Sequence, residues 1–412
     1  MSTHADLSAT YRVNTPAFLG GADNKTTAEF RPASFKGALR FWWRTLMGAT
    51  SSASDLAEKE GRLFGASADK KHGQSPLRMR FELPEPPVQL DAQKDPLTDE
   101  NNRPVKDGAR YLGYGVMEAF GQNKGKLTRP CLKAPFEFTV HFKIRKKDKK
   151  GEKILSSEAI ESLYKALKLL GLLGGLGSKS RKGYGSLTLL SLKEKGKEVY
   201  SAPTTLDDLE STLQELIGPS RFADEPDWTA FSQKSRFLLI PKPGNDSSNL
   251  DLLDSLGRDF VHFRSWGRTV NGKAQVLFKA SEKNFKDDHD LSKGQRVKIQ
   301  HPKRIAFGLP HNYGKGDRNA VAASNFERRA SPLFFHIHHV PGHDPIGIMA
   351  FLPSLFLPKD RDAIKAFGKP VALDKSNLYK PVDDFLHRVL DPTPDPNKPG
   401  KVLFHGAREV KF

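Results

Sequence analysis

The sequence predicts an α+β protein built from two tandem ferredoxin-like (RRM-like) domains with long insertions. Three observations carry this prediction: apolar residues at strand and helix spacings in both halves, a glycine-rich connection after a helix, and a length of 412 residues. Before residue 200 the order of elements is strand, helix, strands, helix and strand, which is the ferredoxin-like order. We therefore expect one domain at 1–200, with an insertion at about 84–110, and a second at 201–412 with loop insertions.

The elements of the first domain follow from local patterns. Residues 10–19 alternate weakly and predict the first strand. The stretch SFKGALRFWWRTLMG (34–48) predicts a helix that Ser34 caps and Gly48 ends. The proline-rich residues 84–110 predict an extended surface excursion. Further along, the patterns predict a strand at 136–144, a helix at 156–170 and a strand at 186–192.

The second half repeats this kind of pattern. A strand is expected at 235–241 and a helix at 250–266, followed by strands at 331–340 and 346–353. Both halves open with a strand and then a helix, which permits a divergent duplication.

Composition narrows the function classes. The chain has 66 lysine and arginine residues against 48 acidic ones, a formal charge of +18, which favours a polyanion as partner. Cys131 is the single cysteine, which excludes an intramolecular disulfide and a zinc site built from several thiolates. The N-terminus does not read as a secretory signal, and the apolar run at 346–358 is too short to span a bilayer. We expect a cytoplasmic protein with no membrane partner, no cofactor and no metal.

The segment GGLGSKSRKGYG (174–185) concentrates glycines and cations in one connection. It lies between a helix and a strand, the reverse of a nucleotide-binding loop, so a phosphate site at a helix N-terminus does not fit. Two interpretations remain: a tight structural turn with solvated cations, or a bare backbone that a sugar-phosphate chain approaches closely. Tyr184, between two glycines, could stack on a base. The loop glycines are Gly174, Gly175, Gly177, Gly183 and Gly185.

The first helix carries a basic stripe. Lys36, Arg40 and Arg44 recur every four residues, and no acid lies between Arg31 and Thr50 to neutralise them along the helix. The stripe is either the solvated face of an amphipathic helix or a surface for an external anion.

Taken together, TPAFLGGADNKTTAEFRPASFKGALRFWWR, GLLGGLGSKSRKGYGSL, FGLPH and RRASPLFF resemble the RAMP superfamily of CRISPR proteins, and within it the subunits of type III-B RNA-guided complexes. The resemblance implies tandem ferredoxin-like domains. It also implies a subunit that binds crRNA, target RNA or both, assembles with other RAMP subunits, and helps capture target RNA near the crRNA 3′ end. In related backbone subunits an aspartate in the corresponding loop supports metal-dependent cleavage, which makes Asp23 the candidate of an alternative endoribonuclease hypothesis.

The sequence favours a non-catalytic role. Asp23 lies in GGADN, which also makes an ordinary turn, and one carboxylate cannot specify a two-metal site. The cluster HIHHVPGH (336–343) lacks a carboxylate or cysteine at fixed spacing, so we expect its histidines to face solvent or RNA rather than a metal. The predicted RNA contacts are Arg31, Lys36, Arg40, Arg44, Lys179, Arg181, Lys182, Tyr184, Arg328 and Arg329, together with the backbone of the five loop glycines.

Overall fold

The structure is a computed structural model. It describes residues 5–66, 73–119, 121–147, 151, 154–218, 222–241, 248–264, 268–270, 273–275, 284–314, 319–391, 404 and 406–412.

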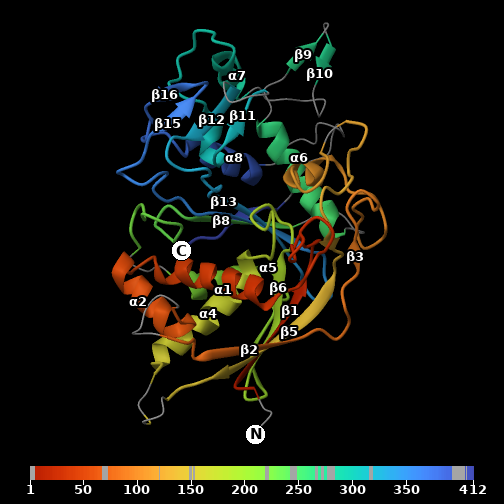
Figure 1. The fold of residues 1–412 in the computed structure, drawn as a ribbon, viewed down its shortest axis with the longest axis vertical. Helices are drawn as coiled ribbons and strands as arrows, with labels where there is room; N and C mark the ends of the chain where they lie inside the picture. Colours follow the sequence, from red (N-terminus) through yellow and green to blue (C-terminus); the bar gives the residue numbers. More distant parts are fainter. Residues whose placement is uncertain are drawn as a thin grey trace.

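A five-stranded sheet forms the first half of the chain (Figure 1). Its order is β2-β5-β1-β6-β7, and every neighbouring pair is antiparallel. The first four of these strands, with one helix after β1 and one after β5, have the order of the ferredoxin-like fold, so this prediction is confirmed. The strands are β1 (Leu7–Val13), β2 (Leu77–Glu82), β5 (Phe136–Ile144), β6 (Leu187–Glu194) and β7 (Lys197–Ser201).

Helices α1 (Pro32–Met47) and α4 (Ser157–Leu173) pack on this sheet, with α2 (Ala53–Phe64) beside α1. The predicted strand at 136–144 is confirmed, and α4 begins after Ser156, whose hydroxyl accepts from the amide of Ala159 at 3.2 Å. The prediction that Ser34 caps the N-terminus of α1 is wrong. Arg31 is the N-cap residue, Pro32 opens the helix because its ring fixes a helical φ, and Ser34 already lies inside the first turn.

A second sheet has the same topology. Its antiparallel order is β13-β14-β8-β17, and α6 (Asn249–Arg264) and α8 (Lys380–Leu390) supply the two crossovers, which completes a second ferredoxin-like unit. Val382, Phe385, Leu386 and Val389 recur at helical spacing on the buried side of α8. The strands are β8 (Arg236–Pro241), β13 (Leu333–His338), β14 (Ile346–Phe351) and β17 (Arg408–Glu409).

The loop insertions of the second half form a smaller sheet of order β11-β12-β15-β16, near the end of the molecule opposite the N-terminus (Figure 1). The 3-10 helix η1 (Lys303–Phe307) packs against α8. The remaining elements are β3 (Gln89–Leu90), α3 (Asp107–Leu112), β4 (Cys131–Leu132), α5 (Leu206–Ile217), β9 (Arg268–Val270), β10 (Lys273–Gln275), α7 (Lys286–Ser292), β11 (His311–Asn312), β12 (Ala320–Ala323), β15 (Ile364–Ala366) and β16 (Lys369–Val371).

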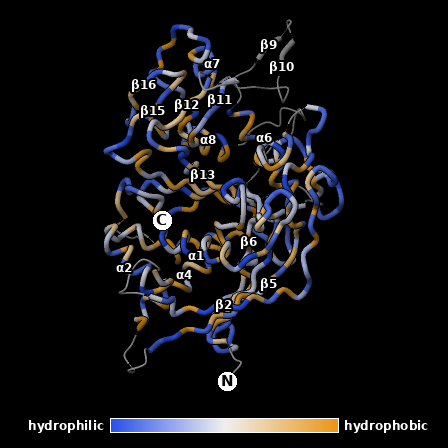
Figure 2. The backbone as a smooth tube through the Cα atoms, in the orientation of Figure 1, coloured by the Kyte–Doolittle hydropathy of each residue, from blue (hydrophilic) through white to orange (hydrophobic). Residues whose placement is uncertain are grey.

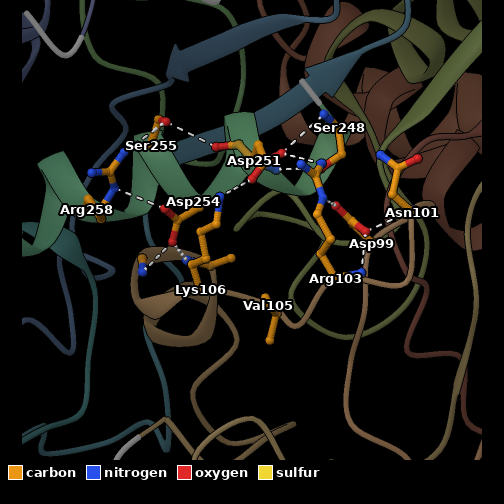
Figure 3. A network of polar contacts seen from close by, with 12 residues as sticks. Asp99, Asn101, Arg103, Val105, Lys106, Ser248, Asp251, Asp254, Ser255 and Arg258 are labelled. Carbon is orange, nitrogen blue, oxygen red and sulfur yellow. Dashed lines mark hydrogen bonds and ion pairs between the residues drawn. The ribbon is translucent and has the colours of Figure 1, made fainter. Parts of the chain in front are cut away.

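The stretch expected to be a surface excursion ends in a packed helix. Val105, Ala109 and Leu112 are buried, and α3 lies against α6. Polar contacts extend this junction along α6 (Figure 3). Arg103 and Lys106 both pair with Asp251, at 2.7 and 2.5 Å. Local composition missed α3 because most of its stabilisation comes from a partner helix about 150 residues later in the chain.

The core is continuous between the two halves. One cluster joins Phe138 and Leu170 of the first half to Phe237 and Ile348 of the second. In Figure 2 apolar colour is frequent around α1, α4 and β13, while polar colour is frequent in the outer loops. The domain division near residue 200 stays a prediction. Among the helices that the structure describes, none is both long and apolar enough to cross a membrane.

Candidate nucleic-acid interface

The glycine loop (residues 174–185) is built against its own chain. The amide of Ser178 donates to Phe18 O at 2.9 Å, and the amide of Gly185 donates to Pro16 O at 3.0 Å. A Cβ on Gly177, whose φ is +86°, would lie 2.5 Å from Phe18 O, and one on Gly185, with φ +63°, would lie 2.1 Å from Leu176 O. These glycines are therefore required by close backbone packing within the protein, which is the structural interpretation of the loop. The interpretation in which the bare backbone admits a sugar-phosphate chain is not supported at these positions.

The loop also joins the two halves. The amide of Phe335, on β13, donates to Arg181 O at 3.1 Å, and the amide of Ile337 donates to Ser186 Oγ at the same distance. Asn14 Nδ2 donates to Ile337 O at 2.8 Å. The edge of β13 is thus held by the loop and by the start of β6.

Two of the three loop cations point into the protein. The Arg181 guanidinium lies over Phe334 and Phe41, with its Cζ 4.5 and 5.1 Å from the ring centroids, and its Nη1 donates to Ser331 O at 2.7 Å. Burial, followed by the charge of Arg329, lowers the pKa of Arg181 to about 10. Lys182 Nζ lies 4.8 Å from the Phe260 centroid and has no hydrogen-bond partner among the described residues. The prediction that Lys182 contacts RNA is therefore wrong, because its amino group is buried between the rings of Phe260 and Phe335.

Replacing Lys182 by methionine is expected to raise the free energy of unfolding by about 1 kcal/mol at neutral pH, because it removes a buried amine without a hydrogen bond. Burial lowers the pKa of Lys182 well below its ordinary value, so the unfolded chain binds more protons than the folded one. The free-energy cost of burying Lys182 therefore declines as pH rises toward about 10.4, the ordinary pKa of lysine. Urea unfolding at about pH 7 and about pH 9.5 should show a smaller gain for the variant at the higher pH. A loss of stability at both pH values would contradict this assignment.

Tyr184 does not present a stacking face. Its ring is fully buried, and its hydroxyl donates to Ala109 O at 2.8 Å. A second Gly-Tyr-Gly segment, at residues 113–115, places Tyr114 on the surface with 61% of the residue exposed. A Cβ on Gly115 would lie 3.9 Å from Lys179 Nζ, so this second segment borders the glycine loop. The sequence holds the same pattern twice, and only burial separates a core tyrosine from an exposed one.

Lys179, which borders this segment, lies within electrostatic range of Arg129 and Arg328, and we call the three side chains the cation group. They come from three distant segments, and both halves of the chain contribute. Burial lowers the pKa of Lys179, and the charges of Arg328 and Arg129 lower it further, so the three charges repel one another. None of them has an acidic partner within 4.0 Å among the residues that the structure describes. An external anion would relieve this repulsion.

Groups on α2 pair with the basic stripe on α1, although only one of them, Glu60, is charged. Arg40 Nε lies 2.7 Å from Glu60 Oε1, and Arg44 Nε lies 3.8 Å from the same oxygen. Lys36 Nζ donates to Phe64 O at 3.0 Å. The premise that the stripe is unpaired is wrong, since its partners come from the next helix. The RNA-binding surface proposed for this protein therefore does not include Lys36, Arg40 or Arg44.

Among the remaining predicted RNA contacts, some side chains are exposed and others bind within the protein. Arg328 is exposed, whereas Arg329 Nε donates to Phe356 O at 2.6 Å and Arg329 Nη2 to Ser354 Oγ at 2.9 Å. Arg329 therefore ties its loop to the chain around residues 354–356. Arg31 is exposed at the start of α1, and its RNA contact stays a prediction.

A pocket of about 380 Å³ opens between α1, the glycine loop and β13. Sequence reasoning missed it, because its walls come from three separate parts of the chain. Periodicity did predict the helix face that lines it. The lining side chains are Ser34, Ala38, Phe41, Trp42, Arg181 and Phe334, together with Leu173, Ser180 and the backbone of Gly174, Gly175 and Gly177.

Asp23 is a turn residue, as the turn hypothesis predicts. Its Oδ1 accepts from the amide of Lys25 at 2.9 Å, and its Oδ2 accepts from the Thr26 hydroxyl at 2.6 Å. The Thr26 hydrogen bond, followed by that from Lys25, lowers the pKa of Asp23. Within the described part of the chain, no three histidine, cysteine or acidic side chains are grouped to hold a metal ion.

The histidine cluster lies mostly inside the protein. His336 and His338 share one face of β13, with ring centroids 5.9 Å apart. Both are fully buried, and His336 Nδ1 donates to Gly174 O at 2.9 Å. Burial lowers the pKa of His336 to about 3. The expectation that these two histidines face solvent or RNA is wrong, because α4, Gly174 at its end and Thr188 of β6 lie against this face of β13.

Comparison with known families defines the class. A model of the RAMP superfamily matches residues 10–188, which run from β1 through α1 and the glycine loop to the start of β6. This match confirms, for residues 10–188, the resemblance to the RAMP superfamily that the sequence predicted.

The chain is similar to a particular subunit within this class. The protein CRISPR system Cmr subunit Cmr1-1 of Pyrococcus furiosus is 23% identical over 339 residues, which cover 81% of this chain and 83% of that protein. The crystal structure of Pyrococcus furiosus Cmr1 in its apo form is 19% identical with a TM-score of 0.50, covering 91% of this chain and 95% of that one, and supports the tandem ferredoxin-like fold. A chain of the type III-B Cmr-beta complex bound to cognate target RNA is 13% identical, with a TM-score of 0.47 and coverage of 93% and 99%.

Proposed function

We propose that this protein is an RNA-binding, non-catalytic subunit of a type III-B CRISPR RNA-guided complex. It helps to capture target RNA near the 3′ end of the crRNA, together with other RAMP subunits, in the cytoplasm. The RAMP-superfamily match and the similarity to a Cmr subunit over most of both chains support this role. The observation that carries RNA binding is the cation group, whose Lys179 borders the segment that holds the exposed Tyr114.

The chemistry of this surface suits a single strand. Lysine and arginine neutralise phosphates, and an exposed aromatic ring stacks on a base of any identity. The surface has no acidic partner at its centre among the described residues, so binding an anion breaks no ion pair there. Sequence selection is then left to base pairing with the guide, as in RNA-guided systems generally.

Replacing Arg129, Lys179 and Arg328 together by alanine is expected to weaken binding of a fluorescent single-stranded RNA at least about tenfold near physiological salt. Each lost phosphate contact removes about 0.7 from the slope of log affinity against log salt, so the slope should become shallower by about 2. Fluorescence anisotropy across a salt series measures both quantities.

The matched control removes the same charge elsewhere. Lys59, Lys286 and Lys380 each pair with an aspartate one helical turn away and lie outside the cation group, so their triple alanine variant should keep the wild-type slope. Equal losses in both variants would mean that bulk charge, and not this surface, binds the RNA. A wild-type protein that shows no RNA binding, alone or assembled with partner subunits, would overturn the proposal.

The alternative is an endoribonuclease that uses Asp23 with a divalent ion. Both carboxylate oxygens of Asp23 accept hydrogen bonds within its own turn, which favours the binding role. The same RNA, incubated with wild-type protein in magnesium and run on a denaturing gel, should stay intact. Cleavage that Asp23→Asn abolishes would favour the nuclease.

A further inference from the structure

Three aromatic side chains, Phe41, Trp42 and Phe334, line the pocket beside the glycine loop. Ser34, Ala38 and Phe41 lie on one face of α1 at helical spacing, and the two small side chains leave the hollow that Phe41 borders. The Phe334 ring lies 6.0 Å from that of Phe41, and the Arg181 guanidinium lies over both rings. Phe41 is only half-buried, so an aromatic edge remains accessible.

We propose that this pocket accepts one unpaired nucleobase from the RNA strand bound at the cation group. The inference rests on the proposed function and adds a base-binding subsite to it. The volume of about 380 Å³ is in the range of pockets for single small ligands and excludes a duplex. Aromatic walls, an arginine plane and a few polar groups are the features that recognise a splayed base.

The position of the pocket argues for a base rather than another apolar group. Gly177 and Ser180 line the pocket. Between them in the sequence are Lys179, which belongs to the cation group, and Ser178, which contacts Arg129 of that group. Arg129 Nη1 donates to Ser178 Oγ at 3.4 Å, which holds this cation beside the loop. A strand whose phosphates lie on the cation group therefore passes the same loop that lines the pocket. A phosphodiester chain would place its charges on the neighbouring cations, which an apolar protein side chain could not do.

Two variants test the base pocket, one by filling it and one by removing part of its wall. Ala38→Phe places a ring in the hollow, and Phe41→Ala removes a wall. The adjacent Gly37→Ala is the matched control, because a Cβ there meets nothing within 4 Å. The probe is a set of short single-stranded RNAs with one abasic residue at successive positions. In the wild type, an abasic residue at the position that reaches the pocket should weaken binding about tenfold, which is typical of a lost base–aromatic stack.

In Ala38→Phe and Phe41→Ala that position should lose its effect, so that all probes bind alike, whereas Gly37→Ala should keep the wild-type profile. The salt slope should be unchanged in all three variants, because the phosphate contacts remain. RNA binding with a normal salt slope but no abasic effect in the wild type would overturn the base pocket and leave the proposed function standing. An abasic profile unchanged by Ala38→Phe, with weaker assembly of partner subunits, would instead assign the pocket to a protein side chain.

Discussion

The Gly257→Ala variant should be less stable than the wild type by about 2–3 kcal/mol, although alanine is the better helix former. Gly257 and Gly108 lie where α6 crosses α3, and a Cβ on Gly257 would lie 2.2 Å from Gly108 O. Backbone atoms fill that space, so the helices must separate, and overpacking of this kind typically costs about 1–3 kcal/mol. Urea denaturation followed by circular dichroism measures the change.

The control lies on another helix. Gly37→Ala, on α1, meets nothing within 4 Å and should stabilise the protein by about 0.5–1 kcal/mol, which is the ordinary helix preference for alanine. If Gly257→Ala were equally stabilising, the close contact between α3 and α6 would be refuted.

The Asp254→Ala variant should lose about 3 kcal/mol of stability. Asp254 lies on α6 and is almost fully buried (Figure 3). Its Oδ1 accepts from the amides of Gly108 and Ala109 at 2.8 and 3.3 Å, and Arg258 Nε lies 3.0 Å from its Oδ2. Removing the carboxylate leaves the first amides of α3 without this acceptor and takes away the carboxylate next to Arg258 Nε. Equilibrium unfolding in urea tests the prediction.

Two further variants test whether the loss of stability in Asp254→Ala comes from the buried carboxylate. Burial raises the pKa of Asp254, which means that the charged carboxylate is disfavoured there. Asp254→Asn removes this charge and keeps an acceptor for the two amides, so it should lose only about 1 kcal/mol of stability. Asp384→Ala breaks the exposed pair with Lys380 and should change stability by less than about 0.5 kcal/mol. Equal losses for Asp254→Ala and Asp384→Ala would exclude the buried junction as the cause.

Much of the fold was predictable from the sequence because it depends on local periodicity. The alternation in 136–144 matches β5, and the helix predicted at 156–170 matches most of α4. The strand–helix order before residue 200 led to the ferredoxin-like topology of the first sheet. The segment 107–112 escaped prediction because its short helix is stabilised by α6 rather than by its own composition.

The candidate site was only partly predictable. The glycine loop and Lys179 stood out because glycines and cations are concentrated there, whereas Arg129 and Tyr114 have ordinary local surroundings. Tyr114 could have been found as the second Gly-Tyr-Gly segment. Composition counts charges, but it does not tell which of them lie over buried rings, as Lys182 does, or beside an acid from another helix, as Arg40 does.

The sequence by itself determined the class of fold, the excess of positive charge and the RAMP-like motifs, because periodicity, composition and short motifs are properties of neighbouring residues. Only the tertiary structure decided which cations face outward and why the loop needs its glycines. Those properties depend on contacts between segments such as 16–18 and 177–185, or 129 and 328, which are brought together only when both halves fold.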